Sequence, residues 1–239
     1  MERILKLAGR SVRYTLHFSS KAQRLSLKIS PEKGLVCVVP RHLSSADIDF
    51  DLLLKTKANW ILHKLEKHAN LQEHSRQHSF VDGCTLPFMG REITLRVVLT
   101  SRKRPSVSLQ RDALFVCTPE ENEEYVCELA TAWYKYAAKK IIPQRVEQLN
   151  ARLCFQYNAI AVRDQKSRWG SCSRKRMLSF NWRLLRVPLF VMDYLIYHEL
   201  AHLKEMNHSV RFWHLVQTIC PQYREAERWL KKNGLLMFW

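Results

Sequence analysis

The sequence predicts an α+β protein in which a β-rich N-terminal region bearing helices, residues 1–118, precedes a C-terminal domain, residues 119–239. Three observations predict this class. Short runs of alternating apolar and polar residues, typical of half-buried strands, fill much of the first region. Apolar residues at helical spacing dominate the chain after Glu120. Hydrophobic residues make up 46% of the chain, enough for a sizeable core without disulfides.

Strands are predicted in the alternating runs before Pro40, at 13–18, 24–29 and 35–39. The turn residues Pro31–Gly34 predict a hairpin between the last two runs. After Pro40 the apolar spacing becomes helical, with Ser44 or Ser45 as the N-cap of a helix that contains Ile48 and Leu52. A second helical run over 57–68 and a polar connection over 69–78 complete this stretch.

The pattern of the first strands recurs later in the chain, where strands are predicted at 93–99, 107–109 and 113–117. Leu25-Ser-Leu27, a turn and Leu35–Pro40 resemble Val107-Ser-Leu109, a turn and Leu114–Pro119, and a predicted helix follows each segment. We therefore expect two strand–strand–helix units built on one plan.

The C-terminal domain is predicted to contain a long helix, a small sheet and shorter helices. Apolar residues at helical spacing cover 120–152, with a bend or break expected near Pro143. Pro188 suits the first turn of a helix that ends near His202. The other elements are predicted as strands at 159–162, 167–172 and 177–182 and as helices at 210–218 and 222–232.

The composition narrows the class of protein. The 39 Lys and Arg residues outnumber the 22 Asp and Glu residues, and the formal charge of +17 favours anionic partners such as nucleic acid, nucleotides or acidic protein surfaces. The charged N-terminus does not resemble a secretory signal, and no run of about eighteen apolar residues predicts a membrane span. We expect a cytoplasmic protein. The seven cysteines form no Cys-x-x-Cys pair, so neither a disulfide framework nor a cysteine zinc site is expected.

One motif indicates a metal site. It is His198-Glu199-Leu200-Ala201-His202, which lies inside an apolar helical run. Residues four apart share one face of a helix, so both imidazoles can bind one metal ion. His208 follows beyond the predicted helix end, and Asn207 before it is suited to the left-handed conformation that would turn the chain back. We therefore predict His198, His202 and His208 as metal ligands.

A site with three histidine ligands points to a catalytic zinc ion. Three protein nitrogens leave the fourth position of tetrahedral zinc for water, whereas structural zinc sites are closed. Glu199 lies at the flank of the histidine face, where it can accept a proton from that water without binding the metal. The sequence thus predicts one zinc ion per chain and hydrolysis by metal-activated water with Glu199 as the catalytic base.

Further motifs resemble the YgjP-like metallopeptidase family of predicted metal-dependent hydrolases. They are Arg168–Ser173, Leu178–Leu184, Pro188, Tyr194, His198–His202 and Asn207–Trp213. The resemblance covers residues 12–233 loosely and 160–215 closely. It implies a zincin-like catalytic domain with zinc on His198, His202 and His208 and with Glu199 as base. It does not extend to the metzincins, because Glu205 stands where their glycine lies between the second and third ligands.

The substrate stays open between three alternatives. A peptide bond is the leading target. The resemblance also implies a nucleoside triphosphate pyrophosphatase acting on an anionic nucleotide. The charge permits a third alternative, a nucleic-acid-associated metal-binding protein. A peptidase is expected to have an exposed edge strand beside the metal, whereas a nucleotide hydrolase is expected to have a closed pocket in which several arginines converge.

Two further residues are candidates for the catalytic site. Arg168 stands in a basic segment next to Trp169 and Gly170, and it is either a ligand for substrate anions or part of a solvated loop. Asn181 either donates to an oxyanion or holds a strand end. Tyr194, Phe212 and Trp213 are expected in the core around the metal helix.

Overall fold

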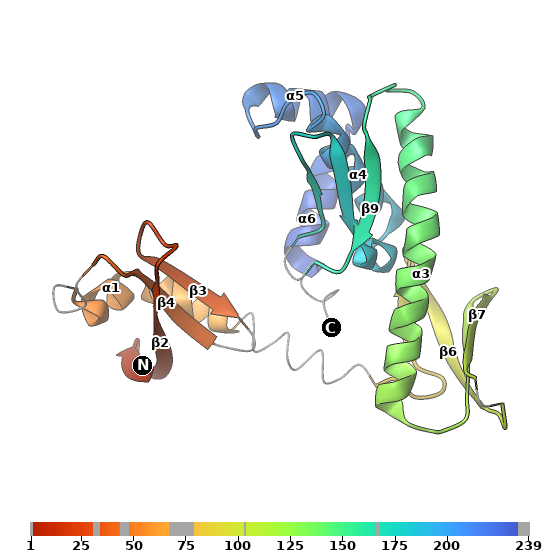
Figure 1. Ribbon diagram of the computed structural model, residues 1–239, viewed down its shortest axis with the longest axis horizontal. Coiled ribbons are helices and arrows are strands. Elements are labelled where there is room, and N and C mark those ends of the chain that lie inside the picture. Colours follow the sequence, from red (N-terminus) through yellow and green to blue (C-terminus); the bar gives the residue numbers. More distant parts are fainter. Residues whose placement is uncertain are drawn as a thin grey trace. The chain divides into compact units, whose positions relative to one another are not determined.

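A computed structural model describes residues 2–30, 34–43, 48–66, 79–102, 104–165 and 168–233. The mixed α+β class is confirmed. The chain divides into two compact units, Met1–Gln77 and His78–Trp239, and the elements of each are labelled in Figure 1. No helix among the described residues combines the length and apolarity that a membrane crossing requires.

The first unit is a four-stranded sheet with helices on one face. Its strands are β1 (Glu2–Leu7), β2 (Arg10–Ser19), β3 (Ser26–Ser30) and β4 (Gly34–Pro40), in the order β1-β2-β4-β3. Tyr14, Leu35 and Cys37 are buried on one face, together with Phe50 and Leu54 of α1 (Phe50–Thr56). Residues 58–66 form a further helical stretch. The polar connection predicted at 69–78 lies outside the described residues.

Helix α1 begins later than the sequence pattern predicts. Its N-cap is Asp49, whose Oδ1 accepts a hydrogen bond from Leu52 N at 2.9 Å. The predicted caps Ser44 and Ser45 lie outside the described residues, and Ile48 precedes the helix. Asp caps a helix as well as Ser does, so cap preference alone does not distinguish Asp49 from the predicted serines.

The second unit contains a sheet with the same topology. Its strands are β5 (Thr85–Phe88), β6 (Arg91–Leu99), β7 (Ser106–Gln110) and β8 (Ala113–Thr118), in the order β5-β6-β8-β7. In both sheets a parallel pair at the centre is flanked by two antiparallel pairs. The common plan predicted from sequence is confirmed, and it is longer than predicted, because β1 and β2 in the first sheet and β5 and β6 in the second also belong to it.

The register corrects the predicted equivalence of the two units by two residues. Leu35 pairs with Ile29, and its counterpart Leu114 pairs with Leu109, so Ile29 rather than Leu27 corresponds to Leu109. Two residues separate β7 from β8 and three separate β3 from β4, a difference that aligning the two sequences alone does not reveal. Strand β5 escaped prediction because it contains Pro87, which is tolerated at a sheet edge.

Helix α3 (Glu123–Asn150) joins this sheet to the rest of the second unit. In Figure 1, β6 and β7 lie beside its first half and β9 beside its second half. Tyr134 Oη donates to Pro87 O at 2.7 Å. Because the second sheet packs on α3, the compact units divide at residues 77 and 78, well before the domain boundary at 118 and 119 that the sequence predicts.

The helix does not break at Pro143. Pro143 stands inside α3, which is continuous over 28 residues. Ile142 and Val146, on either side of it, are fully buried. Their burial offsets the loss of one backbone hydrogen bond, a cost of roughly 3 kcal/mol.

The remaining elements frame the histidine motif. Strands β9 (Ala159–Arg163), β10 (Gly170–Cys172) and β11 (Met177–Asn181) form a sheet in the order β10-β11-β9. The short 3-10 helix η1 (Trp182–Arg186) leads into α4 (Leu189–Ala201), which packs against α3, β10, α5 (Val210–Ile219) and α6 (Tyr223–Asn233). Helix α4 is apolar on nearly all sides, as a buried helix must be.

A bidentate ion pair fastens α4 to α3. Arg145 Nε and Nη2 donate to Asp193 Oδ1 and Oδ2 at 2.7 and 2.6 Å, and the two side chains are 26% and 20% exposed. Asp193→Ala is expected to lower the free energy of unfolding by about 1–2 kcal/mol, measured by chemical denaturation. The matched control is Asp112→Ala, which breaks the exposed pair with Arg91 and is expected to cost less than about 0.5 kcal/mol. Equal losses in both variants would contradict the anchoring role.

Candidate metal centre

The structure brings the three predicted histidine ligands together. His198 lies in the last turn of α4, and His202 is its C-cap. One ring nitrogen of each of His198, His202 and His208 lies within 4.8 Å of the others. His198 Nε2 and His208 Nε2 are 3.0 Å apart. Such convergence of three imidazoles from two segments is the arrangement that a single metal ion requires.

The return of the chain to His208 is built differently from the prediction. Asn207 is not among the residues with a positive φ, so the expected left-handed turn at this position is wrong. Tight backbone hydrogen bonds instead close the end of α4, from Leu203 N to Leu200 O and from Lys204 N to Ala201 O. Ser209 then caps α5, with its Oγ accepting from Phe212 N.

Phe212 forms the floor of the centre, as expected. It is fully buried, and its ring centroid lies 4.5, 4.8 and 4.9 Å from those of His202, His208 and His198. Trp213 stacks on the ring of His208, with 5.9 Å between the two centroids. The aromatic packing therefore restricts the rotamers of all three imidazoles.

The electrostatics of the histidines suit metal binding. Burial, with the neighbouring imidazoles, lowers the pKa of His198 to about 3. Burial also lowers the pKa of His202. His202 Nδ1 lies 3.0 Å from Glu205 O, and because a carbonyl can only accept, Nδ1 carries the proton and Nε2 is left as the ligand atom. Neutral imidazoles with a fixed tautomer fit a divalent ion well.

Glu199 is buried beside this cluster and against the edge of the small sheet. Its side chain is 5% exposed, and burial raises its pKa to about 8, although the nearby charge of Arg168 acts to lower it. A Cβ atom on Gly170 would lie 2.7 Å from Glu199 Oε1. Within the described part of the chain, Oε2 has no hydrogen-bond partner. Gly170 therefore leaves the space that the carboxylate occupies, and Oε2 is a buried acceptor without a donor among the described residues.

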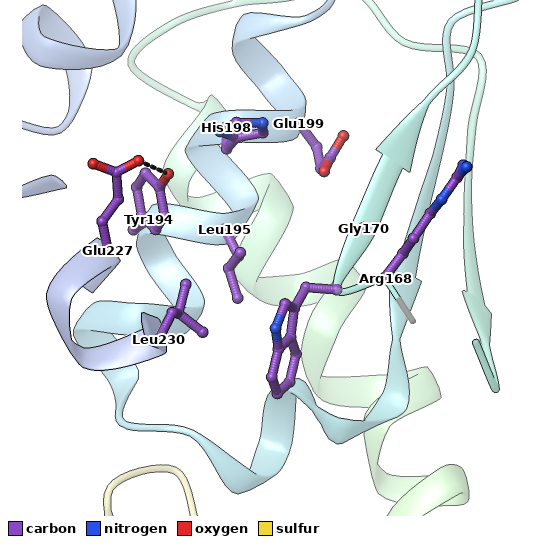
Figure 2. A pocket seen from close by; sticks show the side chains of 9 residues that line it. Arg168, Gly170, Tyr194, Leu195, His198, Glu199, Glu227 and Leu230 are labelled. Carbon is purple, nitrogen blue, oxygen red and sulfur yellow. Dashed lines mark hydrogen bonds between the residues drawn. The ribbon is translucent and has the colours of Figure 1, made fainter. Parts of the chain in front are cut away.

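A pocket of about 390 Å³ adjoins His198 and Glu199 (Figure 2). It extends from His198 and Glu199 between β10, α4 and α6. Its lining is Arg168, Trp169, Gly170, Tyr194, Leu195, His198, Glu199, Glu227 and Leu230. Sequence reasoning missed Leu195, Glu227 and Leu230. Glu227 and Leu230 are separated by three positions on α6, which places them on one helix face, but no pattern in the sequence shows which face meets the pocket.

The two further candidates have different positions. Arg168 is exposed and lines the pocket. Asn181 is fully buried and is not part of the lining. Its Nδ2 donates to Gln165 O at 2.7 Å and to Arg168 O at 2.9 Å, and its Oδ1 accepts from Arg183 N. The carboxamide thus holds the strand end and the backbone on which Arg168 stands, the second of the two roles considered.

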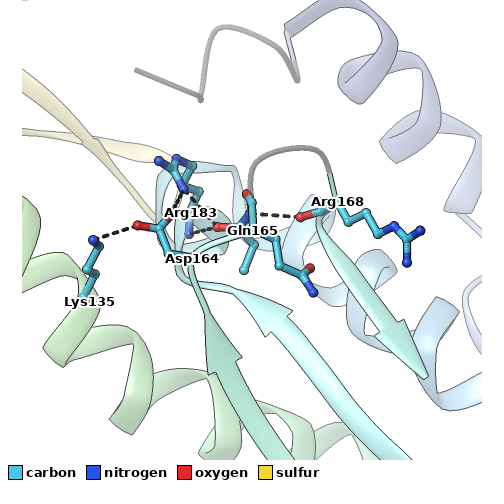
Figure 3. A network of polar contacts seen from close by, with 6 residues as sticks. Lys135, Asp164, Gln165, Arg168 and Arg183 are labelled. Carbon is cyan, nitrogen blue, oxygen red and sulfur yellow. Dashed lines mark hydrogen bonds and ion pairs between the residues drawn. The ribbon is translucent and has the colours of Figure 1, made fainter. Parts of the chain in front are cut away.

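An ion-pair network supports the same backbone from the opposite side (Figure 3). Asp164 accepts from Lys135 Nζ at 2.7 Å and from Arg183 Nη1 at 2.5 Å. Burial acts to raise the pKa of Asp164, but the hydrogen bonds from Lys135 and Arg183 outweigh it and hold that pKa well below its usual range. Arg183, which the sequence places in a basic segment, is therefore structural: its guanidinium also lies 4.4 Å from the Trp182 ring centroid.

Replacing Asn181 tests this scaffold. Asn181→Leu would leave two backbone carbonyls without their donor, so the free energy of unfolding is expected to fall by about 2–4 kcal/mol. Zinc stoichiometry should be unchanged, because no metal ligand lies on this segment. The control Asn158→Ala removes one exposed hydrogen bond to Lys175 O and is expected to cost less than about 1 kcal/mol. A stable Asn181→Leu variant would show that the segment is held by other contacts.

Comparison with known proteins agrees with the geometry. The chain matches the model of the YgjP-like metallopeptidase domain over residues 23–233. No curated protein is significantly similar to it. Among solved structures, the metallopeptidase zymogen of Pyrococcus abyssi abylysin is similar, with 25% identity, a TM-score of 0.35, and coverage of 38% of this chain and 94% of that chain. Because the family model spans most of its length, the chain belongs to the YgjP-like family of metallopeptidase-domain proteins.

Proposed function

We propose that this protein is a zinc-dependent peptidase that binds one zinc ion through His198, His202 and His208. The observation that carries the proposal is the convergence of three imidazole nitrogens within 4.8 Å beside the buried carboxylate of Glu199. Three neutral nitrogen donors are typical of catalytic zinc, and carboxylate oxygens, which magnesium and calcium prefer, are absent from this group of ligand atoms.

Glu199 is proposed as the general base. When bound, zinc supplies Lewis acidity, which polarises a substrate carbonyl and lowers the pKa of water to about 7. Glu199 accepts the proton of the attacking water and then donates it to the leaving amine. A buried carboxylate with a raised pKa is a stronger base than an exposed one, and burial raises the pKa of Glu199 despite the opposing charge of Arg168.

The edge strand β10 favours a peptide as substrate. In the described part of the chain β10 pairs with β11 alone, so it is the edge of its sheet and lies against α4. An extended peptide can add to such an edge by main-chain hydrogen bonds, and Gly170 has no side chain to obstruct it beside Glu199. A triphosphate pocket would need converging cations, and Arg168 is the one cation among the described residues of the lining.

Metal analysis tests the ligand set. Wild-type protein dialysed against zinc is expected to retain about one zinc ion per chain, measured by inductively coupled plasma mass spectrometry. His202→Ala and His208→Ala should each lose it. The control is His214→Ala, which removes an exposed histidine of α5 outside the cluster and should retain zinc. A metal-free wild-type protein would contradict the proposal.

Separation of metal binding from turnover tests the base. Glu199→Gln is expected to keep its zinc and to lose about 10²- to 10⁴-fold in kcat/KM on peptides, because the proton acceptor is gone. Gly170→Ala should also keep zinc and lose about 10²-fold, since the new methyl group displaces the carboxylate.

The change Ser106→Ala, at an exposed position of β7 outside the pocket lining, serves as the control for Gly170→Ala and is expected to leave kcat/KM unchanged. A Glu199→Gln variant that hydrolyses peptides at the wild-type rate would rule out the assigned base. Pyrophosphate release from nucleoside triphosphates by a wild-type protein that cleaves no peptide would transfer the activity to the nucleotide alternative.

A further inference from the structure

The pocket beside His198 and Glu199 is positioned to receive a side chain of the substrate. His198 and Glu199 belong both to the candidate metal centre and to the pocket wall. A peptide whose scissile bond lies at these residues therefore places a flanking side chain in the pocket. Its volume of about 390 Å³ falls within the usual range of ligand pockets, roughly 300–1,000 Å³.

Much of the lining is apolar. Trp169, Leu195 and Leu230 line the pocket, and Tyr194 is only 4% exposed. Walls of this kind stabilise the methylene carbons of a long side chain and do not distinguish one such side chain from another. Specificity must therefore come from a polar group in the lining.

Glu227 supplies that polar group. Its Oε1 accepts from Tyr194 Oη at 3.2 Å, which orients the carboxylate. No ion pair between described residues involves Glu227. Two cations must be considered. Figure 2 shows Arg168 on the opposite side of the pocket, with its side chain directed away from Glu227. Arg224, three positions before Glu227 on the same helix, is exposed and donates to Tyr223 Oη; its charge acts on Glu227 without a direct ion pair between the two side chains.

We propose that this pocket binds a lysine or arginine side chain next to the scissile bond, with the cation paired to Glu227 and the methylene carbons against the apolar wall. The inference rests on the proposed peptidase function and names its substrate class. A neutral side chain brings no positive charge to the carboxylate of Glu227, and an acidic side chain is repelled by it, so both are disfavoured.

The competing role for Glu227 is to orient Tyr194 alone. Tyr194 lies one turn before His198, with 5.9 Å between the ring centroids. If Glu227 acted only through Tyr194, its replacement would affect every substrate alike. A comparison across substrates therefore separates the two roles.

The experiment uses three peptides that differ only in the residue flanking the scissile bond: lysine, norleucine or glutamate, tested on either side of the bond. Turnover is measured with zinc-loaded full-length protein, and binding is measured by calorimetry on the Glu199→Gln variant, so the preference is determined without turnover. Lysine is expected to be favoured over norleucine by about 10- to 100-fold in kcat/KM and in Kd, the difference that one charged hydrogen bond makes.

Glu227→Gln is expected to remove most of this preference, and Glu227→Lys to transfer it to the glutamate peptide. The matched control Glu225→Gln changes an exposed acid of the same helix and should leave the preference intact. Equal binding of the three peptides, or an equal loss on all of them in Glu227→Gln, would overturn the inference. A binding preference without turnover of any peptide would contradict the peptidase and support the cation pocket, whereas turnover without preference would do the reverse.

Discussion

The burial of the last turn of α4 is the constraint on which the site depends. His198, Glu199 and His202 stand where neighbours exclude most water: the aromatic floor on one side and Gly170 of β10 on another. Charged groups are costly in such a place, so the histidines are held neutral and the carboxylate becomes more basic. Burying these polar side chains costs free energy when no metal ion is bound, and a bound cation would offset that cost. Metal binding and folding are therefore expected to be coupled.

The supports of this turn come from distant parts of the chain. Arg145 of α3 holds Asp193 of α4 by two hydrogen bonds. Lys135, also on α3, binds Asp164 at the end of β9, and Arg183 of η1 completes that network. Helix α3 thus acts as a common scaffold for α4 and for the segment that carries Arg168. Its continuity through Pro143 matters because a break would separate these two anchors.

The repeated sheet topology has different surroundings in the two units. The second sheet is covered by α3 and forms one core with the elements around the candidate metal centre. The first sheet has a core of its own with α1. The two sheets therefore share a topology but not a role, since only the second sheet packs in the core that supports the metal centre. This difference also explains why a boundary drawn after β8 divides elements that pack together.

Much of the centre could be predicted from sequence because its information is local. The four-residue spacing of His198 and His202 determines that both face one side of a helix, whatever surrounds them. The alternation of apolar and polar residues predicted most strands, and apolar residues at helical spacing predicted most helices. The repeat was recognisable from the similar residues in its two segments. Misses occurred where local signals were weak or equivalent: the edge strands β1 and β5, the choice between serine and aspartate caps, and the turn before His208.

Only the tertiary structure decided which distant residues share the pocket. Asn181 is close to Arg168 in sequence, yet its side-chain amide does not face the pocket. It donates to the backbone carbonyls of Gln165 and Arg168 instead. Glu227 and Leu230 enter the lining from α6, a helix whose sequence contains no catalytic motif. The sequence by itself determined the metal-binding chemistry, because those ligands are brought together mainly by one helix. The substrate-facing surface was left to tertiary packing, because it forms only where separate elements meet.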